Sequence, residues 1–195
     1  MAYSLDLTGM LSWAATMAAR PDVGYSQPYR SYQTYNGITY FDCSSFVFFA
    51  MWLGGGLDVG SLGYDTNLAH YQSIPRTAFC PALSYDIRIF NTIGCERVSL
   101  DSSQWYPGDF IIKTRAHIEM VYSINPLQAV GARASSYPLA DQVAIHSFDP
   151  SYYDMVYRFP GAVPPTPPDP GYRPHGPLPL WLLKAAQTNH RGGIA

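Results

Sequence analysis

Charged residues are scarce in this sequence, and they never gather into a run of one sign. Lysine, arginine, aspartate and glutamate together make up 13% of the chain, and the formal net charge is −2. Without a basic stripe, neither a nucleic-acid groove nor an anionic membrane surface is indicated as a partner. No apolar segment approaches the ~20 residues that a membrane-spanning helix needs. We therefore expect no nucleic acid and no membrane span.

The pattern of a signal peptide is also missing. Residues 1–6 have neither the basic region nor the apolar core of such a segment. We expect the chain to be made in the cytoplasm without a signal peptide. If it acts outside that cell, another component must deliver it.

Cysteine is rare, with three residues: Cys43, Cys80 and Cys95. An odd and small number does not suggest a disulfide framework. Cys80 and Cys95 are expected to be reduced structural thiols, and the alternative is a bond between them that leaves Cys43 free. No histidine or cysteine spacing of the zinc type occurs, so we expect no metal and no other cofactor.

Hydrophobic residues, in contrast, make up 47% of the 195 residues, and sixteen tyrosines dominate the aromatic content. This composition is typical of one globular domain with a sizeable core. The composition changes after residue 159, where nine prolines occur between positions 160 and 179. We expect a folded domain at 1–160 and a proline-rich linker with a short C-terminal tail at 161–195. Residues 180–187 are long enough for two helical turns at most.

The stretch most suggestive of chemistry is Asp-Cys-Ser-Ser at residues 42–45. It precedes an apolar run that ends at the three glycines 54–56, which is the pattern of a capped helix with a stop signal. The unpaired N–H groups and the dipole of a first helical turn favour a thiolate. The polar cap argues against burial of Cys43, although most free cysteines are small buried hydrophobes. Both interpretations stay open from this stretch alone.

Apolar residues have helical spacing in the first part of the chain, and the later part has the pattern of short strands. Residues 5–19 have the spacing of an amphipathic helix, and the tyrosine-rich residues 21–40 are predicted to form a loop. After a mixed region with a short helix near 66–72, strands are predicted at 110–114, 116–122, 128–132, 142–148 and 155–159. This is the α+β order, in which the Cys43 helix packs against an antiparallel sheet of about five strands.

A nucleophilic cysteine needs a base, and His117 is the best placed of the five histidines. It opens a predicted strand directly after a turn, from which its ring can project toward the start of a helix. Glu119 lies on the same strand face, where it would orient the imidazole or would be a solvent-facing residue on an edge. His146 lies in the middle of a strand, as a functional, core or surface histidine. The remaining histidines are poor candidates: His70, His175 and His190.

Seven motifs occur in the order and approximate spacing of NlpC-type cell-wall cysteine peptidases. The chain resembles the bacteriophage-lysin branch of that family most, in which a cysteine amidase or endopeptidase domain precedes a linker and a wall-binding module. The resemblance covers residues 1–160. It rests on the thiol stretch 41–46, the turn and strand 107–111, the strand 117–121, and residues 23–26, 131–133, 139–145 and 153–159.

The resemblance implies a papain-like fold, no cofactor and bacterial peptidoglycan as the partner. It implies that Cys43 is the nucleophile and His117 the base. Tyr25 matches the family's tyrosine ahead of the cysteine, which would hydrogen-bond the oxyanion together with the backbone N–H of Cys43. Asp42 and Ser44 would line the substrate cleft or lock the start of the helix.

The third catalytic residue departs from the family pattern. Many members carry a polar residue, often histidine, on the strand after the base, whereas this chain has Ala-Val-Gly-Ala at 129–132. We predict that Glu119 orients His117, and Gln128 and His146 are the alternatives.

The function implied is hydrolysis of an amide bond in the cell-wall peptide, by an endopeptidase or an N-acetylmuramoyl-L-alanine amidase. Such a bacteriolytic protein is released at lysis or belongs to the virion, and a further wall-binding module or virion component would follow the linker. Two other classes stay open. One is acyl transfer on the same thiol-hydrolase architecture, and the other is a non-catalytic wall-binding or tail module.

Overall fold

The computed structural model describes residues 3–73 and 80–160. The expected linker and tail at 161–195 lie outside the described residues. The helices are α1 (Leu7–Ala18), α2 (Cys43–Phe49), α3 (Leu68–Ser73), α4 (Arg88–Thr92) and α5 (Leu139–Gln142), with a π-helical turn η1 (Ala50–Gly54) and the 3-10 turns η2 (Ser102–Gln104) and η3 (Pro150–Tyr152). The strands are β1 (Val23–Tyr25), β2 (Ser31–Tyr35), β3 (Ile38–Phe41), β4 (Glu96–Arg97), β5 (Phe110–Lys113), β6 (His117–Ile124), β7 (Leu127–Ala132), β8 (Val143–Ser147) and β9 (Met155–Arg158).

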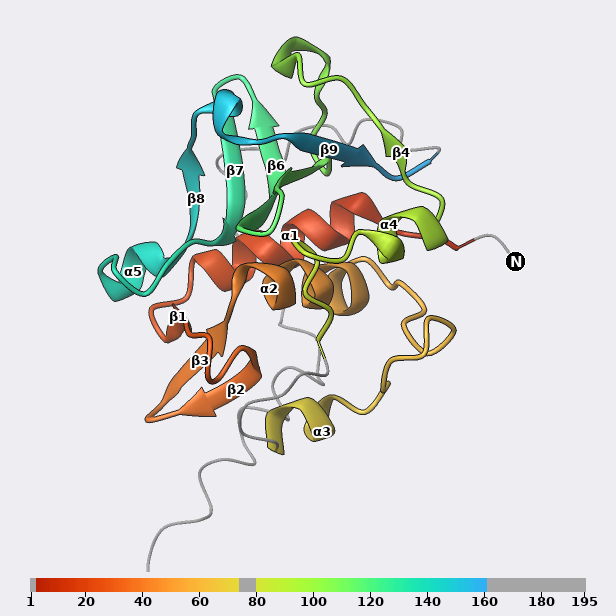
Figure 1. Cartoon of the computed structure of the whole chain (residues 1–195). Helices are drawn as coiled ribbons and strands as arrows, with labels where there is room; N and C mark the ends of the chain where they lie inside the picture. Colours follow the sequence, from red (N-terminus) through yellow and green to blue (C-terminus); the bar gives the residue numbers. More distant parts are fainter. Residues whose placement is uncertain (1–2, 74–79, 161–195) are drawn as a thin grey trace, which may run out of the picture.

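These elements form an α+β fold with two sheets (Figure 1). The large sheet is antiparallel throughout, with six strands in the order β4-β9-β5-β6-β7-β8. Helices α1 and α2 lie along one side of this sheet, and α2 contacts β6 and β7. The five strands predicted from the sequence are confirmed to within two residues at each end, and β4 adds a sixth at the edge.

Helix α2 begins where the sequence predicts. The Asp42 carboxylate accepts a hydrogen bond from the Ser45 backbone N–H at 2.7 Å, and the Ser45 hydroxyl accepts one from the Asp42 N–H at 2.9 Å. This reciprocal capping box satisfies two N–H groups that the first turn leaves unpaired. Every residue of α2 is buried. The helix continues through η1 and ends near Gly56, whose φ of 67° is the left-handed conformation that glycine tolerates.

The central strand β6 separates two hydrophobic clusters. Ile118 and Met120 belong to the main core, which also contains the buried residues of α1 and α2. By the alternation of a strand, Glu119 and Val121 point to the opposite face, where Val121 joins a second cluster that includes Trp105. Glu119 therefore lies on the side of the sheet away from the main core, whereas His117, at the first position of β6, reaches Cys43 of that core.

The prediction of a loop at residues 21–40 is wrong, because this segment forms the small sheet. Its strand order is β1-β3-β2, with β1 parallel and β2 antiparallel to β3. Asn36 and Gly37 connect β2 to β3 with φ values of 51° and 78°. Two successive positive φ values are typical of a type I′ hairpin turn, for which Asn-Gly is the favoured pair.

The irregular region before β5 packs beside the thiol helix. The Ser84 N–H donates to the Ser44 hydroxyl at 3.4 Å, and the Arg115 N–H donates to the Ser84 carbonyl at 2.7 Å. Cys80 and Cys95, which flank this region, are buried free thiols, as the sequence predicts. Residues 74–79 lie outside the described residues.

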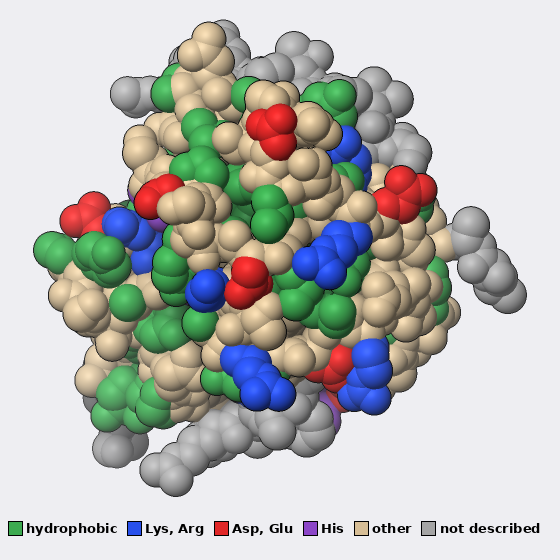
Figure 2. Space-filling model, turned by 45° about the horizontal axis from the view of Figure 1, so that its top comes forward, with side chains coloured by type: hydrophobic (Ala, Val, Ile, Leu, Met, Phe, Trp, Pro, Cys, Tyr) green, Lys and Arg blue, Asp and Glu red, His purple; other side chains and the backbone are tan. Residues whose placement is uncertain are grey.

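The face shown in Figure 2 carries acidic and basic side chains interspersed with hydrophobic ones. Across residues 3–73 and 80–160, no helix has the length and apolar character needed to cross a lipid bilayer.

Two glycines allow α1 to approach η1 closely. A Cβ atom on Gly9 would lie 2.4 Å from the carbonyl oxygen of Gly54, which no real contact allows. Helix propensity alone favours alanine over glycine. We nevertheless expect Gly9→Ala to lower the free energy of unfolding by about 1 to 3 kcal/mol, because the two backbones must separate.

Urea denaturation measures this change. Ser12→Ala on the same helix is the matched control, and it should stay within about 0.5 kcal/mol of the wild type. A stabilised Gly9→Ala protein would show that the close approach is not a constraint.

Candidate active site

His117 joins the first residue of α2 to the large sheet. As the first residue of β6, it interacts through its ring with the Cys43 side chain, and its Nε2 lies 3.2 Å from Oε1 of Glu119. Burial opposes the charged imidazole, but the hydrogen bonds to Cys43 and Glu119 outweigh it and raise the pKa of His117 to about 10. The ring is therefore an imidazolium at neutral pH. With Nε2 facing Glu119, Nδ1 is the nitrogen available to the thiol.

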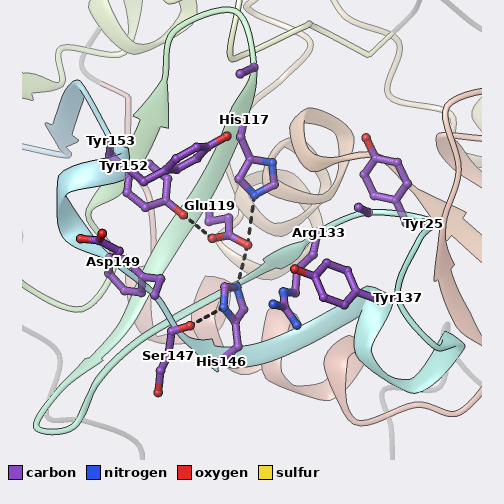
Figure 3. A pocket seen from close by; sticks show the side chains of 13 residues that line it. Tyr25, His117, Glu119, Arg133, Tyr137, His146, Ser147, Asp149, Tyr152 and Tyr153 are labelled. Atoms are coloured by element: carbon purple, nitrogen blue, oxygen red, sulfur yellow. Dashed lines mark hydrogen bonds and ion pairs between the residues drawn. The ribbon is translucent and has the colours of Figure 1, made fainter.

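Glu119 is the centre of a buried polar network (Figure 3). Its side chain is 1% exposed, and Oε1 accepts a hydrogen bond from Nε2 of His146 at 2.8 Å, in addition to the contact with His117. The Tyr153 hydroxyl donates to Oε2 at 2.5 Å. Burial alone would raise the pKa of Glu119, but the hydrogen bonds from His117 and His146 hold it well below its usual range. The carboxylate is thus ionised and fully engaged.

His146 faces two acceptors. Its Nε2 lies 2.8 Å from the Glu119 carboxylate, and its Nδ1 lies 2.9 Å from the carbonyl oxygen of Ser147. The ring is thus held between the carboxylate and the backbone of its own strand. Glu119 therefore contacts two histidine rings rather than one.

Gly131 leaves room for Glu119. It lies beside Glu119 on the neighbouring strand β7, where a Cβ atom would approach Cγ of Glu119 to 2.6 Å and Oε1 to 2.8 Å. The absence of a side chain at Gly131 thus makes the space that the buried carboxylate occupies.

A groove of about 520 Å³ opens over this network. Its lining residues are Tyr25, Ala116, His117, Glu119, Arg133, Ala134, Tyr137, His146, Ser147, Phe148, Asp149, Tyr152 and Tyr153. Cys43 is not part of the lining and is 5% exposed, so the sequence argument against its burial is wrong. The thiol adjoins the groove through His117.

Tyr25 lies on the wall of the groove opposite the sheet residues (Figure 3). Its hydroxyl accepts a hydrogen bond from Nε2 of Gln27 at 2.5 Å, which leaves its own proton free to be donated. The backbone N–H of Tyr25 donates to Oε1 of Gln142 at 2.8 Å. The tyrosine is therefore held at its backbone and oriented at its hydroxyl.

Asp42 and Ser44 lie at the helix start and not along the groove. Besides capping α2, the Asp42 carboxylate forms an ion pair with Arg30 at 3.1 Å. Asp42 and Ser44 are each 3% exposed. Gln128, one alternative for the third catalytic residue, contacts the Ser123 hydroxyl at 3.2 Å and does not line the groove.

Sequence reasoning missed Tyr153 and Arg133 as site residues. Both belonged to motifs that the resemblance used, but nothing local indicates that their side chains meet at one groove. Among the described residues, no group of three or more histidine, cysteine, aspartate or glutamate side chains has the arrangement of a metal site.

Comparisons with known proteins identify no relative of this chain: no family model, no curated protein and no solved structure matches it.

The raised pKa of His117 predicts a pH-dependent contribution to stability. A group whose pKa is higher in the folded state stabilises that state fully below its unfolded value, about 6.5, and loses this contribution as the pH rises to its folded value, about 10. We expect the difference in unfolding free energy between the wild type and His117→Gln to shrink by at least about 1 kcal/mol between about pH 6 and pH 10.

Urea denaturation of both proteins across this range measures the difference. Because the two proteins share every other titrating group, the difference isolates His117. A difference that stays constant with pH would contradict the raised pKa.

Proposed function

We propose that this chain is a cysteine hydrolase that cleaves an amide bond in the peptide part of bacterial peptidoglycan. The observation that carries the proposal is the imidazole of His117, which contacts the Cys43 thiol and the buried Glu119 carboxylate. Nucleophile, base and orienting carboxylate in one chain of contacts are the parts that thiol-dependent amide hydrolysis requires. The choice of peptidoglycan rests on the resemblance of residues 1–160 to NlpC-type peptidases.

We also propose that the fold is papain-like. In support, the thiol lies at the start of a buried helix, and the histidine opens a strand of the antiparallel sheet on which that helix packs. We further propose that the protein acts on the cell wall, either after release at lysis or as part of a virion.

In the first step, His117 holds the proton of Cys43, and the thiolate attacks the amide carbonyl carbon. A bond forms between Sγ and that carbon, and the carbonyl oxygen becomes an oxyanion. The Cys43 backbone N–H and the Tyr25 hydroxyl donate hydrogen bonds to it, and Gln27 leaves the phenolic proton available for this purpose. The C–N bond then breaks while His117 transfers its proton to the leaving amine.

In the second step, water hydrolyses the thioester. His117, now neutral, takes a proton from the water molecule, and the hydroxide bonds to the acyl carbon. The thiolate leaves and pairs again with the protonated His117, and the carboxylic acid formed loses its proton to solvent to give a carboxylate. Through both steps Glu119 stays ionised, held by His146 and Tyr153, so it keeps the His117 ring oriented without accepting its proton.

The roles of Cys43 and Tyr25 predict different losses of activity. Cys43→Ala should leave no clearing of purified, sonicated cell walls, because no thioester can form. Tyr25→Phe should lower the rate by roughly 100- to 1,000-fold, the usual effect of removing one oxyanion donor.

Turbidity and the release of new amino groups measure both rates. Cys95→Ala is the matched control, since this free thiol lies outside the groove, and it should still clear the walls. Clearing by Cys43→Ala would refute the nucleophile.

The role of Glu119 predicts a change in pH dependence as well as in rate. Glu119→Gln keeps the shape but removes the charge, so kcat/KM should fall by about 100- to 10,000-fold. Because the pKa of His117 loses one of the interactions that raise it, the alkaline limb of the kcat/KM profile should move to lower pH.

Gln128→Ala tests the alternative on the neighbouring strand and should leave the profile in place. If Gln128→Ala shifts the alkaline limb and Glu119→Gln does not, the orienting role belongs to Gln128.

A further inference from the structure

One cationic side chain in the groove has no part in the mechanism above. Arg133 follows the last residue of β7, is half-buried and lines the groove beside His146 (Figure 3). Its guanidinium carbon lies 4.0 Å from the centre of the Tyr137 ring. Stacking of this kind fixes the plane of a guanidinium group while its N–H groups remain available at the edge.

Arg133 differs from the arginines that serve the fold. Within residues 3–73 and 80–160, none of the ion pairs includes Arg133. Four other arginines each pair with an aspartate: Arg20, Arg30, Arg88 and Arg158. Arg97 and Arg115 form no ion pair with a described residue either, but both are exposed and lie outside the groove. Arg133 is the half-buried arginine of the lining, without a carboxylate partner among the described residues, and a groove is where a ligand can supply one.

The segment that carries Arg133 is held in place before any ligand arrives. The Arg133 N–H donates to the Gln142 carbonyl at 2.7 Å, and Nε2 of Gln142 donates to the Tyr137 carbonyl at 3.0 Å. Oε1 of the same glutamine accepts from the Tyr25 N–H at 2.8 Å. One residue therefore sets the position of Arg133 relative to the tyrosine on the opposite wall.

The acids that line the groove are already engaged and do not compete for the guanidinium. The Glu119 carboxylate contacts His117 and His146 and accepts a hydrogen bond from the Tyr153 hydroxyl. The other carboxylate of the lining, Asp149, accepts hydrogen bonds from the N–H and hydroxyl of Ser151 in η3. Among the ion pairs of the described residues, neither acid is joined to Arg133, so the guanidinium can receive a carboxylate from a ligand.

We propose that Arg133 binds a carboxylate that the substrate carries close to the scissile amide, and that the enzyme thereby selects peptides with a free carboxylate over their carboxamide forms. The inference rests on the proposed hydrolase function and adds the substrate class of the same groove. The planar fork of a guanidinium donates hydrogen bonds to both oxygens of a carboxylate, whereas a carboxamide offers only one acceptor oxygen.

The test uses one substrate in two chemical forms. Soluble muropeptides are divided into two portions, and carbodiimide with excess ammonium chloride converts the carboxylates of one portion to carboxamides. The full-length wild type should cleave the untreated portion with a kcat/KM roughly ten- to a hundredfold higher than that of the amidated portion. The release of amino groups gives both rates.

Variants assign the preference to one side chain. Arg133→Gln should cleave both portions at the same low kcat/KM, with most of the loss in KM. Arg133→Lys keeps the charge without the fork and should recover part of the preference. Arg88→Gln is the control, because that arginine is exposed, paired with Asp86 and outside the groove, and it should retain the full preference. Equal cleavage by the wild type, or a preference that survives in Arg133→Gln, would overturn the proposal.

A binding measurement separates this proposal from the proposed reaction. If the wild type cleaves neither portion, the hydrolase function fails, and calorimetric titration of Cys43→Ala with the two portions decides the role of Arg133. Tighter binding of the untreated portion, lost on adding Arg133→Gln, supports the carboxylate site. Equal binding of both portions excludes it.

Discussion

The structure depends on one ionised carboxylate buried in its sheet. Removing a charged group from water costs several kcal/mol unless partners replace the lost hydration. Glu119 obtains those partners from His117 on its own strand, from His146 two strands away and from Tyr153 before β9. The strand order β9-β5-β6-β7-β8 is what brings them to one point. The site therefore depends on the strand order, because a different order would separate the Glu119 carboxylate from its partners.

The start of α2 is fixed by a second, local arrangement. The capping box between Asp42 and Ser45 sets the first turn, and the ion pair with Arg30 ties that turn to the segment before β2. Cys43 is therefore the first residue of a capped helix, and it faces a histidine that the sheet holds in place. Cys43, His117 and Tyr25, the proposed nucleophile, base and oxyanion donor, come from three separate parts of the chain, each with its own support.

Much of this arrangement was predictable where the signal is local. Asp42 and the glycines at 54–56 predict both ends of the thiol helix, and alternation predicts the strands from β5 to β9. The Asn36-Gly37 pair was a sufficient signal for the hairpin, but the tyrosines around it were interpreted as a loop. The sequence does not show the register in which the strands pair. Only the pairing of β7 with β8 shows that His146 reaches Glu119, and only packing shows that Cys43 is buried. The catalytic roles of these residues stay predictions.

The glutamine that joins the two walls has a consequence for synthesis. Tyr25 and Gln142 are 117 residues apart, so the wall that carries Tyr25 leaves the ribosome long before the residue that anchors it. Tyr153, the last partner of the buried charge, follows later still. A nascent chain therefore carries its thiol helix for most of translation without a groove beside it. The groove can therefore be complete only after residue 153 has left the ribosome.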